Sequence, residues 1–267
     1  MSEVSTDPQV TVLPEASKPA GKHQPASHTG SMSSLQSLAT TVVIAVFVIT
    51  FIVQAFQIPS ESMEKTLLVG DYLLVDKVHY GQSRVWGWLL PYHPIQRQDI
   101  IVFRYPVNPK QHFVKRVVAV PGDRVRLINK HVYVNGVPQD DDYATFNWEQ
   151  HDKFRDNFPD GGFYGDKISA KWFLQARKLL DDKELLVPQG SFFVLGDNRD
   201  DSYDSRYWGF VPAENVVGRP WLIYWSMDRT TPAIARELPS DRLSSLAHNV
   251  ANLVDGLRWN RMLRTVE

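Results

Sequence analysis

Three segments of the sequence concentrate residues that can carry out chemistry, and each adjoins an apolar run. In PSESMEKTLLVGD (59–71), two serine hydroxyls follow a long apolar stretch. In HFVKRVVAVPGD (112–123), a lysine lies among apolar side chains. The third segment, GDNRDDSYDSRYWGFVP (196–212), is rich in Asp, Arg and Ser, a composition that often marks only a solvated turn. Serine and lysine side chains together allow nucleophilic attack assisted by a base.

Lys115 is a candidate for such a base, provided that the fold buries it. A free lysine has a pKa of about 10.4 and is protonated at neutral pH. Burial among apolar groups disfavours the ammonium form and can lower that pKa by several units. Lys115 lies in FVKRVVAV, where burial is feasible. Because side chains alternate along a strand, we expect Arg116 on the opposite face, toward water.

Two other arrangements compete for the same role. Ser62 and Lys65 form an S-x-x-K pattern, as in β-lactamases and penicillin-binding proteins, but the S-D-N and K-T-G elements of those enzymes are absent. We therefore interpret Lys65 as a solvated surface lysine. A Ser-His-Asp triad stays open, although no G-x-S-x-G elbow surrounds Ser62 and the histidines show no metal-binding spacing. Surface or structural histidine is the better interpretation.

Taken together, the three segments resemble the type I (leader) signal peptidase family, membrane-bound serine–lysine endopeptidases that remove signal peptides from exported proteins. The resemblance covers most of residues 56–136 and 187–226, in the family's order, and LRWNRMLR resembles the family's C-terminal end. It is weak between those ranges and absent from the first 34 residues. Most relatives have proline where Lys65 stands. Three long ordered motifs are far more specific than one short pattern.

The resemblance implies a role for each matching residue. Ser62 matches the nucleophile and Lys115 the general base, so we predict that their oxygen and nitrogen lie within hydrogen-bond reach. Ser60 matches a hydroxyl that forms an oxyanion hole with the Ser62 backbone N–H. Ser202 matches the serine that orients the lysine. A charged pair that supports the site is matched by Asp204 and Arg206. A substrate pocket for alanine-sized side chains is matched by Phe56, Ile58 and Val114.

The implied reaction is cleavage of a peptide bond through an acyl-enzyme, with deacylation by water that Lys115 activates. It needs no metal and no other cofactor. The implied partners are preproteins that bear signal peptides and the lipid bilayer, and the enzyme would work beside the secretion translocon. A formal net charge of −1 gives no bias toward nucleic acid.

Three alternatives make different predictions. A tethered binding protein with an inactive protease-like fold would cleave nothing. A β-lactam-reactive cell-wall enzyme that uses Lys65 would be labelled by penicillin, and the labelling would depend on Lys65. A soluble, self-cleaving Ser–Lys repressor is disfavoured because an apolar span stands where a DNA-binding module would be.

The elements around these motifs are mostly short strands. Runs such as DYLLVDKV, DIIVFRY and SFFVLGD are dense in β-branched and aromatic residues and are bounded by turn residues. RLINKHVYVNGVP indicates a hairpin with a further Asn-Gly turn. Without alternating helices, this pattern predicts a mainly β fold, an antiparallel sheet or barrel-like catalytic domain over 58–267. An inserted α/β segment is expected at about 139–187, with a helix over Ile168–Leu180.

The chain before this domain is apolar and uncharged. No charged residue occurs between Lys22 and Glu61, and about 20 apolar residues suffice to span the roughly 30 Å hydrocarbon core. We predict one transmembrane helix over 35–57, after a disordered tail over 1–34. The positive-inside rule favours a cytoplasmic N-terminus, which places the catalytic domain outside the plasma (inner) membrane, on the periplasmic side.

The absence of cysteine from all 267 residues excludes disulfides, a thiol nucleophile and cysteine metal sites. Near the C-terminus, LSSLAHNVANLVDGLRW has apolar residues at helical spacing and predicts an amphipathic helix that packs on the domain or lies on the membrane.

Overall fold

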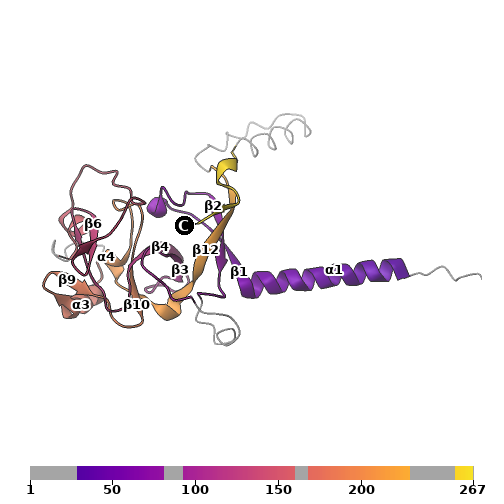
Figure 1. Cartoon of the computed structure of the whole chain (residues 1–267), viewed down its shortest axis with the longest axis horizontal. Helices are drawn as coiled ribbons and strands as arrows, with labels where there is room; N and C mark the ends of the chain where they lie inside the picture. The colour runs from indigo at the N-terminus through magenta and orange to yellow at the C-terminus, as the bar shows by residue number, and fades with distance from the viewer. Residues whose placement is uncertain (1–28, 81–92, 160–167, 229–255, 267) are drawn as a thin grey trace, which may run out of the picture. The chain divides into compact units, whose positions relative to one another are not determined.

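The computed structural model describes residues 29–80, 93–159, 168–228 and 256–266 (Figure 1). The chain divides into two units, Met1–Ile44 and Ala45–Glu267. The C-terminal amphipathic helix predicted from sequence falls almost entirely on 229–255, and most of the predicted tail falls on 1–28. Both ranges lie outside the described residues.

The helix α1 (Thr29–Phe47) presents an apolar, solvent-exposed surface. The hydroxyls of Thr40 and Thr41 donate to the carbonyls of Gln36 and Ser37, four residues earlier, each at 2.9 Å. This back-bonding satisfies hydroxyls in an otherwise apolar helix. The large exposed apolar side chains of the helix are Leu35, Leu38, Val42, Val43, Ile44, Val46 and Phe47.

The helix predicted over 35–57 ends earlier than expected. After Phe47 the backbone forms a π-helical turn at Val48–Ile52, and Val53–Gln57 is a strand, β1. This strand pairs antiparallel with β2 (Asp71–Asp76), and tertiary pairing thus overrides the local helical preference. Among the residues that the structure describes, no helix has both the length and the apolarity needed to cross a membrane.

The second unit is mainly β, as predicted, and every pair of strands in its two sheets is antiparallel. The larger sheet has eight strands, and β12 is its longest member because it pairs in turn with β2, β3 and β13. In spatial order, the sheet consists of β1, β2, β12 (Val216–Ser226), β3 (Ile100–Arg104), β4 (His112–Ala119), β10 (Ser191–Leu195) and β11 (Val211–Pro212), with β13 (Arg264–Thr265) beside β12.

The five-stranded sheet contains the predicted hairpin. Its two turns, Asn129–Lys130 and Asn135–Gly136, have positive φ at both central residues, which is typical of type I′ turns. The strands in spatial order are β7 (Val137–Pro138), β6 (His131–Val134), β5 (Arg124–Ile128), β9 (Glu184–Leu186) and β8 (Leu180–Asp181). The last two belong to the segment predicted as an insertion, which therefore completes this sheet.

The helices of the insertion pack on this sheet. Helix α3 (Ala170–Leu179) confirms the predicted helix, and the Ser169 hydroxyl caps it by accepting from the backbone N–H of Trp172. The Trp172 ring is buried edge-on against Phe210, 5.2 Å between centroids, in one hydrophobic cluster with the second sheet. The remaining short helices are α2 (Lys153–Asp156), α4 (Ser205–Trp208), η2 (Glu61–Met63), η3 (Ala213–Asn215) and η4 (Trp259–Arg261).

Candidate active site

Ser62 lies in η2, a single 3-10 turn directly after β1. The buried side chains of Ile58 and Met63 hold this turn against a hydrophobic cluster that includes Leu67. Backbone bonds from Ile58 N–H to the Asp71 carbonyl and from Gly70 N–H to the Ile58 carbonyl fix the chain on entry. The position of the serine is therefore set by packing on both sides, since Ile58 and Met63 flank it in sequence.

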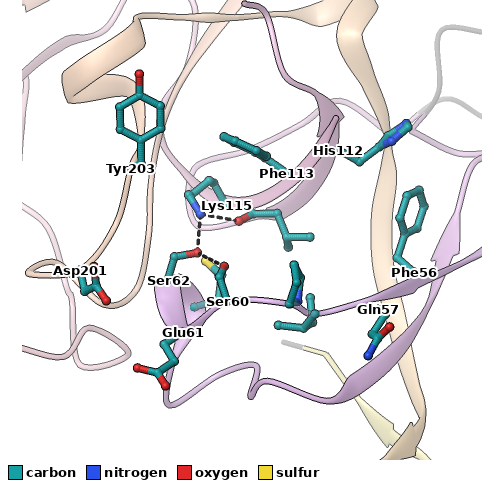
Figure 2. Close-up of a pocket in the computed structure, with 14 residues that line it drawn as sticks. Phe56, Gln57, Ser60, Glu61, Ser62, His112, Phe113, Lys115, Asp201 and Tyr203 are labelled. Atoms are coloured by element: carbon teal, nitrogen blue, oxygen red, sulfur yellow. Dashed lines mark hydrogen bonds between the residues drawn. The ribbon is translucent and has the colours of Figure 1, made fainter. Parts of the chain in front are cut away.

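Lys115 reaches Ser62 from β4. The strand pairs with β3 so that Lys115 stands opposite Ile101, and its side chain is 4% exposed. Its Nζ lies 2.5 Å from the Ser62 Oγ and 3.1 Å from the Val114 carbonyl oxygen (Figure 2). The predicted hydrogen-bond contact between Ser62 and Lys115 is thus confirmed.

Burial changes the acid–base properties of this lysine. Desolvation lowers the pKa of Lys115 to about 8, against the opposing pull of the carboxylates of Asp204 and Asp197. The guanidinium of Arg206 acts in the same direction as desolvation and contributes to this lower pKa. A much larger fraction of the amine is therefore neutral near pH 8 than for a free lysine, as abstraction of a serine proton requires.

The other two predicted serines also come to this site. Ser60 Oγ lies 3.3 Å from Ser62 Oγ. The buried Ser202 Oγ makes no hydrogen bond to Lys115 in the part of the chain that the structure describes. Ser202 packs beside Gly196, where an added Cβ would stand 2.2 Å from Ser202 Oγ and 2.4 Å from the Ser62 carbonyl oxygen.

The predicted charged pair of Asp204 and Arg206 is present and fully buried. Two contacts of 2.8 Å join the guanidinium to the carboxylate, and the Gly196 N–H donates to the same carboxylate at 3.1 Å. Burial alone would raise the pKa of Asp204, but Arg206 and the hydrogen-bond donors to the carboxylate together hold that pKa below its usual value. The aspartate is therefore an anion close to Lys115.

Arg116 does not face water, which corrects the expectation from strand alternation. It is 5% exposed, and its guanidinium donates two hydrogen bonds of 2.9 and 2.8 Å to the Asp197 carboxylate. The Thr66 hydroxyl donates to the same carboxylate at 2.6 Å. Asp197 thereby joins the strand of the lysine to the segment after the serine. Sequence reasoning missed this role because the opposite face of β4 is covered by residues far away in sequence.

A cavity of about 420 Å³ opens at the Ser62–Lys115 contact. Phe56, Ile58 and Val114, the three predicted pocket residues, all line it. Figure 2 shows Phe56 and His112 on one side of the pair, with Glu61 and Asp201 on the other. The cavity is mostly apolar on the Phe56 side and carries carboxylates on the other.

Lys65 is exposed, in agreement with its interpretation as a surface lysine, and its ammonium donates to the backbone carbonyl of Asp142. Its φ of 80° is one that proline, with φ fixed near −65°, cannot adopt. The backbone at residue 65 is therefore incompatible with the proline usual at this position.

This chain is similar in sequence to known proteins. The model of the family described as "Signal peptidase, peptidase S26" matches residues 31–225. A signal peptidase I of Leptolyngbya laminosa is 33% identical and the match covers 86% of this chain and 95% of that protein; one of Aquifex aeolicus is 35% identical, with coverage of 75% and 88%. The crystal structure of a signal peptidase I from Enterococcus faecalis is 34% identical in sequence, with a TM-score of 0.36 and coverage of 48% of this chain and 97% of that chain.

Proposed function

This chain belongs to the signal peptidase family, peptidase S26, whose members are serine endopeptidases, and we propose that it is a signal peptidase I that cleaves N-terminal signal peptides from exported preproteins. One observation carries the assignment of roles. The nitrogen of a buried lysine with a depressed pKa, Lys115, lies 2.5 Å from the hydroxyl oxygen of Ser62. A serine with such a neighbour is equipped for nucleophilic attack without a histidine.

The first half of the reaction follows from this contact. Neutral Lys115 takes the proton of Ser62 while the serine oxygen attacks the carbonyl carbon of the scissile peptide bond. The Ser62 backbone N–H and the Ser60 hydroxyl donate to the oxyanion that forms. When the tetrahedral intermediate collapses, the C–N bond breaks and the leaving amine takes the proton from Lys115. The signal peptide remains as an ester on Ser62.

Hydrolysis of the ester completes the cycle. Lys115 is neutral again and removes a proton from a water molecule that attacks the ester carbonyl. Collapse of the second intermediate breaks the bond to Ser62 Oγ, which recovers its proton from Lys115. The products are the signal peptide with a free carboxylate and the mature protein with a new amino terminus.

The substrate would lie along the cavity. We assign the small side chains before the cut to the region lined by Phe56, Ile58 and Val114, because it is the apolar part of the cavity at the reacting pair. Asp204 and Arg206 support the base electrostatically. Ser202 is assigned to orient Lys115 once substrate fills the site, since its buried hydroxyl has no partner among the described residues.

The decisive experiment compares variants of the full-length chain on a purified preprotein. We expect Ser62→Ala and Lys115→Ala each to lower kcat by at least about 10³-fold, because either change removes the attack step. Lys65→Ala is the matched control, since it removes a neighbouring lysine that is exposed and bonded elsewhere. Cleavage by Ser62→Ala at the wild-type rate would overturn the assignment.

We also propose that the apolar segment before the domain inserts into the plasma membrane, with the N-terminus cytoplasmic and Ser62 on the outer side, beside the secretion translocon. The absence of charge between Lys22 and Glu61 supports this, as do the exposed apolar side chains of α1. The helical backbone also continues past Phe47 to Ile52. Ser62 would then stand where an inserted signal peptide ends.

Membrane extraction tests this second proposal. The full-length chain should stay with the membranes in alkaline carbonate, and added protease should digest the catalytic domain only from the outer side. A double change, Val43→Asp with Ile44→Asp, should release the chain because each charge opposes insertion. Val137→Asp, at an exposed apolar position in β7, is the control and should remain bound. Retention of the double variant in the membrane fraction would contradict the proposal.

A further inference from the structure

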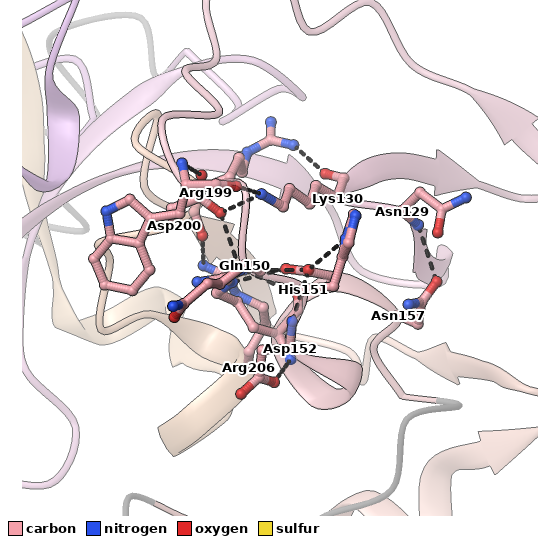
Figure 3. A network of polar contacts seen from close by, with 12 residues as sticks. Asn129, Lys130, Gln150, His151, Asp152, Asn157, Arg199, Asp200 and Arg206 are labelled. Atoms are coloured by element: carbon pink, nitrogen blue, oxygen red, sulfur yellow. Dashed lines mark hydrogen bonds and ion pairs between the residues drawn. The ribbon is translucent and has the colours of Figure 1, made fainter.

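A buried cluster of ion pairs connects the insertion to the polar loop 196–206. Its centre is Asp200, whose side chain is fully buried. Lys130 Nζ lies 2.8 Å from the Asp200 Oδ1 (Figure 3). Arg155 Nη2 lies 3.3 Å from the same oxygen. The backbone N–H of Trp148 donates to Asp200 Oδ2 at 2.8 Å. Two segments outside the three sequence motifs thus converge on one carboxylate of the loop.

Arg155 is the best-anchored member of this cluster. It is 5% exposed, its Nε donates to Asp156 Oδ1 at 2.7 Å, and its Nη2 donates to the Gln150 carbonyl at 2.8 Å. Its guanidinium also stands over the Trp148 ring, 5.2 Å from the centroid. A side chain with this many buried partners is held in one orientation.

The same residue contacts the loop a second time, through its main chain. The Arg155 carbonyl accepts a hydrogen bond of 3.1 Å from Arg206 Nη1. Arg206 also donates to the Arg199 carbonyl at 3.0 Å (Figure 3). Its guanidinium pairs with Asp204. The insertion thus holds Arg206 from the side away from its carboxylate partner.

The position of this loop matters to both reacting groups. The backbone N–H of Asn198 donates to the Ser62 carbonyl at 3.1 Å, so the loop contacts the serine's own main chain. Asp204 and Arg206 act on Lys115 in opposite directions, the carboxylate raising its pKa and the guanidinium lowering it. A displaced loop would therefore disturb the serine and the lysine together.

We propose that Arg155, in the insertion, is a positioning residue for the Ser62–Lys115 pair. It holds the polar loop at Asp200 with its side chain and at Arg206 with its carbonyl oxygen. This inference rests on the proposed function and gives the insertion a role in it. The sheet β5–β9 then serves as the rigid support of the site.

Loss of the Arg155 contacts is expected to change the pH dependence of cleavage. Asp197 is held independently by Arg116, and Asp204 by the Gly196 N–H. If Arg206 alone moves away from Lys115, the lysine therefore loses a cation that lowers its pKa and keeps the carboxylates that raise it. The pKa of the base rises, and a larger fraction of it is protonated at neutral pH. The charged groups that act on Lys115 are Asp197, Asp204 and Arg206, and the other titratable groups lining its cavity are Glu61, His112, Asp201 and Tyr203.

The test measures kcat and KM against pH for Arg155→Met, Arg155→Lys and Arg124→Met in the full-length chain. For Arg155→Met we expect the rise of kcat/KM with pH, on the acid side of the profile, to move up by about 0.5–1 pH unit. We expect kcat at pH 7 to be lower by about 3–10-fold and KM to change less than about 2-fold. Arg155→Lys should give a smaller shift because an ammonium keeps a charge beside Asp200. Arg124→Met, which breaks the exposed pair with Asp181, should match the wild type.

The outcomes separate this inference from the proposed function. If Ser62→Ala is inactive but both Arg155 variants keep the wild-type pH profile, the positioning role is wrong and the proposed function stands. An equal loss of kcat at every pH, without a shift, also overturns the role because it indicates general destabilisation. If Arg155→Met does not fold, Arg155→Lys decides alone, and an unshifted profile overturns the proposal.

Discussion

The Nζ of Lys115 lies 2.5 Å from the Oγ of Ser62, although 53 residues separate them in the chain. The two arrive from different directions, the serine on a turn after β1 and the lysine on the strand β4. Because the lysine is almost fully buried, its contact with the hydroxyl is made in a medium that disfavours the ammonium form. Proximity and a shifted proton equilibrium are thus produced by the same packing.

The first prediction concerns the pH dependence of cleavage. Lys115 acts when it is neutral, and burial lowers its pKa to about 8. We expect kcat/KM to rise about tenfold per pH unit below that value and to level off above it. The measurement is a pH profile on a peptide without titratable groups near the cut. A rise that continues to about pH 10.4, the value for free lysine, would contradict a buried base.

The second prediction concerns the pH dependence of stability. Between about pH 8 and the unfolded lysine value, the unfolded chain binds one more proton at Lys115 than the folded chain. The free energy of unfolding should therefore rise with pH across this window, by about 3 kcal/mol from this group. Lys115→Met lacks the proton and should lack that part of the rise.

Urea unfolding at pH 7 and pH 10 measures the effect as a difference between variants. Ser62→Ala is the control because it removes the neighbouring hydroxyl and keeps the lysine. Equal pH dependence in Lys115→Met and the wild type would show that the lysine is not titrating with a depressed pKa. The activity of Lys115 as a base would then need an explanation other than burial.

Local signals were sufficient to predict much of the β fold, and the resemblance to a known family predicted the reacting pair. Strand composition and turn residues such as Asn135–Gly136 act over a few residues, so they can be recognised in the sequence. Ser62, Lys115 and the pocket residue Ile58 were placed by resemblance, and the cavity gathers all three.

Other features depend on pairing across the fold and could not be predicted in this way. Alternation along β4 gave the right direction for Arg116 but the wrong environment, because Asp197 and Thr66 cover that face. The helix before the domain ends early because β2 offers residues 53–57 a partner strand. The contacts of Arg155 with Asp200 and Arg206 join the third motif to an insertion that carries no recognisable motif of its own.

The third prediction concerns the close packing at Gly196. A Cβ there would stand 2.4 Å from the Ser62 carbonyl oxygen and 2.2 Å from Ser202 Oγ. Relief of the clash requires movement of the nucleophile's own backbone, so we expect Gly196→Ala to lower kcat by about 10²-fold, the typical effect of a displacement of about 1 Å. Preprotein cleavage measures this.

Gly190→Ala is the control for that change. A Cβ on Gly190 meets nothing within 4 Å, and its φ of 70° imposes backbone strain on alanine without touching the site. It should lower stability slightly and leave kcat unchanged. Wild-type kcat in Gly196→Ala would mean that the loop and the serine are not packed as closely as the structure places them.

The fourth prediction concerns the buried pair of Arg116 and Asp197, whose side chains are 6% and 1% exposed. Asp197→Asn leaves the guanidinium buried without its anion, and removal of one partner of such a pair typically costs about 3–5 kcal/mol in unfolding free energy. The same change removes a carboxylate that raises the pKa of Lys115. The variant should therefore be much less stable, while the rise of its kcat/KM with pH moves to lower pH.

Urea unfolding measures the loss of stability, and the pH profile of the folded fraction measures the shift in kcat/KM. Asp181→Asn, in an exposed pair with Arg124, is the control and should change neither. An unfolding free energy equal to that of the wild type would show that Asp197 does not join the strand of the base to the segment of the nucleophile.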